Sequence, residues 1–130
     1  MPPFHYRSEI LAVERMTAAL RGLGAFLPAA LGEALVTASY EFGCNLHGDL
    51  LYQPMRVGTQ WLGRFIDDSL AQRIVISTQS DFRFRIPEDR LEILFCHEGD
   101  VHLNGTDIDL LHALLAESAF QGLGFQIQSE

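Results

Sequence analysis

The stretch that decides the fold is DFRFRIPEDRLEILFCHEGDVHL, residues 81–103. Over its first six positions, apolar side chains alternate with charged ones. The apolar members are Phe82, Phe84 and Ile86. Alternation with a period of two is typical of a strand that buries one face and exposes the other. We therefore expect a strand over residues 81–86.

Two turns divide the rest of this stretch. Residues 87–90 combine proline with charged residues and predict a turn, so residues 91–96 form a second strand. Gly99-Asp100 suits a two-residue turn with glycine first, and residues 101–103 then return as a third strand. The stretch thus predicts an antiparallel meander of three strands.

These turns fix an expected register. The first turn places Arg85 opposite Glu92. The second places His97 opposite His102 and puts both histidines at the end of the core face, where cross-strand β-carbons lie about 5 Å apart. The register therefore predicts a pair of neighbouring imidazoles at the end of the second hairpin.

Helical patterns precede the meander. Apolar residues at steps of three and four predict helices over residues 8–22, 28–43 and 59–71, with Ser8 and Thr59 as caps and Pro28 in a first turn. The run at 74–78 is rich in β-branched residues and is a candidate edge strand. Gly22-Leu23-Gly24 is interpreted as a helix end.

After the meander, Thr106 caps an apolar helix that continues to Gly122, and residues 125–128 form a last strand. The order of elements indicates an α+β fold. N-terminal helices pack on an antiparallel β-meander, followed by one buried helix and a short C-terminal strand. A length of 130 residues fits a single domain over residues 1–130.

Charge is distributed unevenly along the chain. The net charge is −8. Residues 1–66 hold five arginines and five acids, whereas residues 67–130 hold four arginines and twelve acids. The acidic pI near 5.0 argues against a nucleic-acid partner. The absence of lysine excludes Schiff-base chemistry and a P-loop.

Targeting signals are not evident either. No apolar stretch is long enough to span a bilayer, and two cysteines do not make a disulfide framework. We therefore expect a cytoplasmic protein without a membrane association.

The charge asymmetry favours a binding function. We expect a non-enzymatic module that presents an acidic C-terminal half to a basic protein, as an inhibitor, an immunity-like protein or a chaperone-like adaptor does. The residues expected to contact the partner are acids that follow Arg90 in the chain. They are Glu98, Asp100, Asp107 and Asp109.

Two alternatives stay open. The first is a small metal-assisted or histidine-based enzyme that uses His97 and His102, with Cys44 or His47 as further ligands, although we expect no cofactor. The second, which is compatible with the binding module, is a homodimer or larger assembly formed through unpaired strand edges at residues 74–78 or 125–128.

Overall fold

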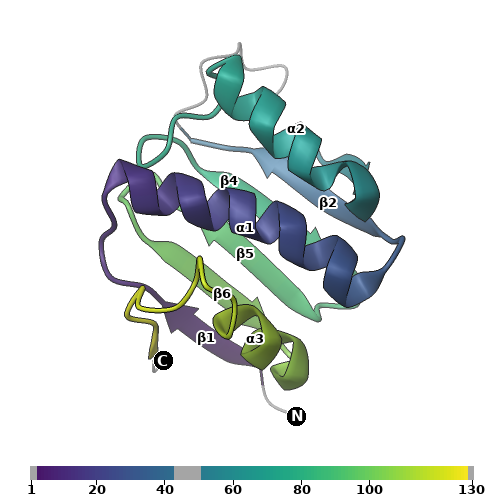
Figure 1. Ribbon diagram of the computed structural model, residues 1–130, viewed down its shortest axis with the longest axis vertical. Coiled ribbons are helices and arrows are strands. Elements are labelled where there is room, and N and C mark those ends of the chain that lie inside the picture. The colour runs from purple at the N-terminus through teal and green to yellow at the C-terminus, as the bar shows by residue number, and fades with distance from the viewer. Residues whose placement is uncertain (1–2, 43–50, 129–130) are drawn as a thin grey trace.

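The described part of the chain folds into a seven-stranded antiparallel sheet with three helices on one of its faces (Figure 1). The computed structural model describes residues 3–42 and 51–128. This arrangement confirms the expected α+β fold, with helices packed on an antiparallel sheet.

The meander lies in the middle of the sheet, and the remaining strands extend it on both sides. Across the sheet, the strands are β3 (Met55–Gly58), β2 (Leu35–Tyr40), β4 (Phe82–Ile86), β5 (Leu91–Phe95), β6 (Val101–Gly105), β1 (Phe4–Arg7) and β7 (Gln126–Ile127). The strand at the N-terminus therefore lies between β6 and the last strand.

The helices are α1 (Val13–Leu31), α2 (Thr59–Ala71) and α3 (Ile108–Leu115). In Figure 1, α1 crosses in front of β4 and β5, with α2 and α3 on either side of it. The core lies between these helices and the sheet. Its largest members are fully buried, among them Phe82, Phe84 and Phe95. Within the described residues, no helix is long and apolar enough to cross a bilayer.

The N-terminal part of the prediction is wrong in two places. The chain begins with a strand, β1, and α1 starts at Val13 and continues past Pro28 to Leu31. Residues 35–40, expected inside a second helix, form β2 instead. A proline in the last turn does not end this helix, and the alternating burial of β2 shows the period that the helical interpretation overlooked.

A close helix contact explains why α1 contains glycine. A β-carbon at Gly24 would lie 2.9 Å from the Cα of Gly63 in α2. The two helices thus approach each other through their backbones at this point. The glycine that suggested a helix end is needed for packing, and its helix-breaking tendency is offset by the contact.

Two further boundaries differ. Residues 74–78 form turns, so they supply no sheet edge. The edge strands are β3 and β7, of which β7 corresponds to the expected strand at residues 125–128. The last helix ends at Leu115, well before Gly122, whereas α2 has the predicted bounds.

The two hairpins of the meander test the expected register. The first is confirmed, with Arg85 opposite Glu92. The second is wrong, because Leu94 lies opposite His102 and Phe95 opposite Val101. Gly99 has a φ of 93° and closes a three-residue loop in place of a two-residue turn. This odd shift in register moves His102 to the other face of the sheet.

Candidate functional site

The face of the sheet opposite the helices is polar. Arg83, on β4, pairs with Glu41 at 3.0 Å and also with Glu92 on β5. Arg85 reaches the second oxygen of Glu92 at 3.1 Å. These charges satisfy one another, so the middle of this face holds two arginines and two glutamates in a neutral network.

The tip of the β4–β5 hairpin has an unusual backbone. Residues 87–90 form the turn between the strands, which the Arg90 amide closes by donating to the Pro87 carbonyl at 3.4 Å. The two central residues, Glu88 and Asp89, have φ values of 66° and 56°. A two-residue hairpin favours positive φ at both positions, because only that twist matches the strands, and Asn-Gly normally supplies it. Here two acidic side chains occupy left-handed positions that cost ordinary L residues about 1–2 kcal/mol each.

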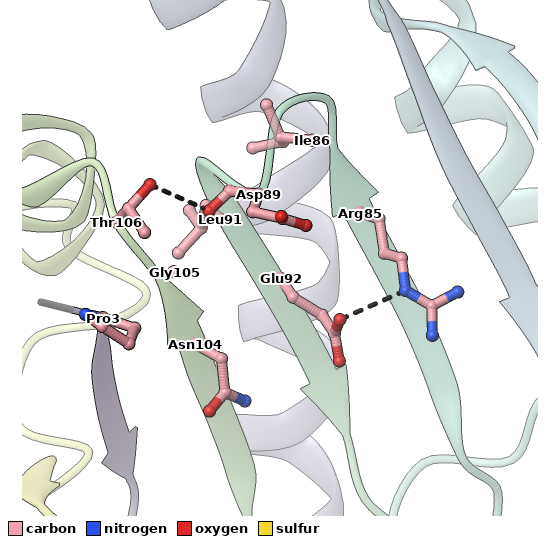
Figure 2. A pocket seen from close by; sticks show the side chains of 9 residues that line it. All are labelled: Pro3, Arg85, Ile86, Asp89, Leu91, Glu92, Asn104, Gly105 and Thr106. Carbon is pink, nitrogen blue, oxygen red and sulfur yellow. Dashed lines mark hydrogen bonds and ion pairs between the residues drawn. The ribbon is translucent and has the colours of Figure 1, made fainter.

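A pocket of about 370 Å³ lies beside this tip (Figure 2). Asp89, Glu92 and Asn104 line it with polar groups. The Thr106 hydroxyl donates to the Asp89 carbonyl oxygen at 3.1 Å and ties the tip to the end of β6. The pocket therefore combines carboxylate and amide groups with the guanidinium of Arg85, which pairs with Glu92, beside an exposed turn (Figure 2).

A second hollow lies on the other side of the same tip. Its volume is about 430 Å³, and Leu35, Arg56, Pro87 and Glu88 are among the residues that line it. Leu35 is 52% exposed. The hollow thus combines an apolar side chain, a proline and carboxylates with two arginines, Arg56 and Arg85. We name its acidic and apolar part the hairpin tip: Leu35, Pro87, Glu88 and Asp89.

The four acids expected to bind a partner are divided between the two ends of β6. Asp107 and Asp109 lie at the start of α3, next to the tip end of the sheet. Asp107 accepts a hydrogen bond from the Leu110 amide at 3.0 Å and pairs with Arg90 at 2.9 Å. The Leu110 amide and Arg90 lower the pKa of Asp107. Asp109 is exposed.

The other two acids lie at the opposite end of the strand. Glu98 is exposed in the β5–β6 loop, whereas Asp100 is only 2% exposed. The buried carboxylate pairs with Arg7 at 2.7 Å and lies 3.2 Å from a ring nitrogen of His102. The four acids therefore do not form one exposed surface. Their role in partner binding stays a prediction, and Glu98 and Asp109 are the exposed members of the set.

Asp100 belongs to a cluster that the second hairpin assembles. Cys96, Asp100 and His102 each place one donor atom within 4.8 Å of the others. Burial raises the pKa of the Cys96 thiol to about 11, with the Asp100 carboxylate acting in the same direction. Burial lowers the pKa of His102, although Asp100 opposes this effect. Near neutral pH, Cys96 is therefore a protonated thiol and His102 a neutral imidazole.

His97 has different partners. Its Nδ1 lies 2.8 Å from Oδ1 of Asp81, and the same oxygen accepts a hydrogen bond from the His97 backbone amide at 2.6 Å. The ring also contacts Phe42, with centroids 4.2 Å apart. The expected His97–His102 pair is therefore wrong, and the ring that stacks on His102 is that of His5, with centroids 5.7 Å apart.

The remaining metal candidates are Cys44 and His47, which lie outside the described residues. Sequence reasoning missed three members of this end of the sheet, namely His5, Arg7 and Asp81. His5 and Arg7 lie on β1, a strand that the sequence pattern did not predict. The spacing of Asp100 and His102 was a usable signal, because residues two apart on a strand share a face.

No protein-family model matches the chain, and comparison with curated proteins and with solved structures gives no match.

Proposed function

We propose that the protein is a non-enzymatic binding module for a basic protein, and that the hairpin tip makes the contact. The observation that carries the proposal is the pair of acidic residues held at positive φ, with values of 66° and 56°. Strained backbone is concentrated at functional positions, because stability alone favours its removal.

The surroundings of the tip support a protein partner. No ion pair involves Glu88 or Asp89 within the described part of the chain, so both carboxylates are available to a lysine or arginine. Leu35 and Pro87 add apolar area next to these charges. A long basic side chain places its methylene groups on such a surface and its charge on the acids. The net charge of −8 draws basic partners from a distance.

The test uses pull-down from a lysate of the native host with three variants of equal charge change. The tip variant is Glu88→Gln/Asp89→Asn. The matched control, Asp67→Asn/Asp68→Asn, removes an adjacent acid pair from the outer face of α2. A third variant, Glu98→Gln/Asp109→Asn, tests the two exposed acids predicted from the sequence.

A basic protein retained by the wild type and by both control variants, but lost by the tip variant, supports the proposal. Cross-linking from position 88 then has to reach that protein. Equal loss in all three variants means that only general charge attracts the partner. If the tip variant still retains the basic protein, the proposal is contradicted. If only the third variant loses that protein, Glu98 and Asp109 make the contact.

A second copy of the chain is the alternative partner. β3 forms one edge of the sheet with four residues, whereas β7 at the other edge has two. An antiparallel pairing of two β3 strands across a two-fold axis satisfies their free backbone groups. Light scattering over a range of concentrations tests this dimer. Arg56→Pro should disrupt it, because the amide of Arg56 points away from β2, and a strictly monomeric wild type contradicts it.

A further inference from the structure

The β5–β6 hairpin brings three metal-binding side chains to one face of the sheet. Asp100 and His102 are two residues apart, so their side chains point to the same side. Cys96 lies across the hairpin from Asp100, and its backbone amide donates to the Asp100 carbonyl at 2.8 Å. This is the face away from the helices, at the end of the sheet opposite the hairpin tip.

One atom of this cluster lacks a partner. Oδ1 of Asp100 is buried and receives no hydrogen bond from the described residues. Burying a carboxylate oxygen without a donor is unfavourable, because the oxygen gives up its hydrogen bonds to water. The other oxygen is already occupied by Arg7 and His102. Oδ1 is therefore the Asp100 oxygen that is available to a cation.

We propose that Cys96, Asp100 and His102 bind a zinc ion, with the Asp100 oxygen Oδ1 as the carboxylate ligand. Sulfur, imidazole nitrogen and carboxylate oxygen are the donors that zinc uses in proteins. The donors lie within 4.8 Å of one another. Around a tetrahedral zinc, nitrogen and oxygen ligands are about 3.4 Å apart, given bond lengths near 2.1 Å. Nε2 of His102 lies 3.2 Å from Oδ2, the other oxygen of this carboxylate, so the ring already stands beside the group that supplies Oδ1.

The neighbours of the three ligands support the site. His5 Nε2 lies 3.4 Å from Nδ1 of His102, so it can fix the ring with Nε2 toward the metal. Arg7 holds Oδ2 of Asp100 and leaves Oδ1 for the ion. Three protein ligands leave a fourth position for water or for a group from a ligand, as in zinc sites that are open to solvent.

A competing cluster around the same cysteine is less suited. Asp81, Cys96 and His97 also lie within 4.8 Å of one another. However, Oδ1 of Asp81 already accepts two hydrogen bonds from His97, one from the backbone amide and one from the ring. Within the described residues, no buried oxygen of Asp81 lacks a partner, whereas Oδ1 of Asp100 does.

The test titrates the metal-free full chain with Zn²⁺ by calorimetry and with Co²⁺ by absorption spectroscopy, in which a charge-transfer band reports a bound thiolate. The ligand variants are Cys96→Ser, Asp100→Asn and His102→Gln. The matched controls are Cys44→Ser, which tests the other thiol, and His97→Gln, which tests the competing cluster. Circular dichroism confirms that each variant folds.

We expect one zinc ion per chain and a cobalt–thiolate band. Each ligand variant should lose affinity at least tenfold, and the band should vanish in Cys96→Ser while both controls retain it. His5→Ala should weaken binding by about 10–100-fold. Absence of saturable binding overturns the proposal, as does a band that persists in Cys96→Ser. If Cys96→Ser does not fold, unchanged affinity in the partly exposed His102→Gln overturns it equally.

Discussion

Replacing the two central turn residues of the hairpin tip, Glu88 and Asp89, by Asn and Gly should stabilise the protein. The change is Glu88→Asn/Asp89→Gly, which supplies the pair that a two-residue hairpin of this twist prefers. The wild-type residues have φ values of 66° and 56°. Each ordinary L residue in this region costs about 1–2 kcal/mol, and asparagine and aspartate pay less because their short side chains bond locally.

The expected gain follows from these terms. Asparagine at position 88 lowers the cost of the positive φ there, which contributes about 1 kcal/mol to the free energy of unfolding. Glycine at position 89 removes the backbone strain at that position. Glycine also loses more freedom on folding, which costs about 0.5–1 kcal/mol. The net stabilisation is about 1 kcal/mol, which corresponds to a rise in Tm of about 3–5 °C for a chain of this size.

Thermal and urea unfolding of the wild type and the variant measure this difference. The control is Glu88→Gln, which removes one charge but keeps a long side chain at positive φ, so its stability should stay near that of the wild type. A variant with Asn-Gly that is no more stable than this control refutes the reasoning, because the tip then stores no strain. If the Asn-Gly variant is more stable and still binds the partner as tightly as the wild type, the strain at positions 88 and 89 has no role in binding.

Three further changes test the fold, each by urea unfolding. Gly24→Ala should destabilise the protein by about 1–3 kcal/mol, because the new methyl carbon lies 2.9 Å from the facing Cα. Gly63→Ala, whose methyl carbon has no contact closer than 3.8 Å, should be tolerated, and equal losses would contradict the close approach. Asp107→Asn keeps a cap but loses the charge, so it should cost about 0.5–1 kcal/mol near neutral pH. Because the folded state lowers the pKa of Asp107, this contribution exists above the unfolded pKa of about 3.9 and disappears as the pH falls through the folded value. A difference that does not change with pH would rule out the charge effect. Arg83→Met should destabilise the protein more than Arg85→Met, by about 1 kcal/mol or more. The Arg83 side chain is 21% exposed and pairs with two acids, whereas the Arg85 side chain is 50% exposed. Equal losses of stability would mean that burial does not strengthen the network.

The parts of the fold that could be predicted are those with an unambiguous period. The strands of the meander and the first hairpin register follow from alternation and from a turn that has only one plausible length. α2 follows from an apolar stripe that starts after glycine and threonine. The N-terminal elements could not be predicted in the same way, because the signals at Gly24 and Pro28 have two physical meanings. A glycine between helices and a glycine that ends a helix look identical until the facing residue, here Gly63, is known.

The candidate metal site illustrates how much depends on one turn. The residues from Cys96 to His102 are rich in metal-binding types, but the register expected from the sequence pairs His97 with His102. With Gly99 at a φ of 93°, the loop holds three residues and not two. This shift places Cys96 opposite Asp100 and moves His102 to the open face, where β1 adds His5 and Arg7. The residue types of a site can therefore be predicted from a sequence. Which of those residues share a face depends on whether the loop has an even or an odd number of residues, and here a single glycine sets that number.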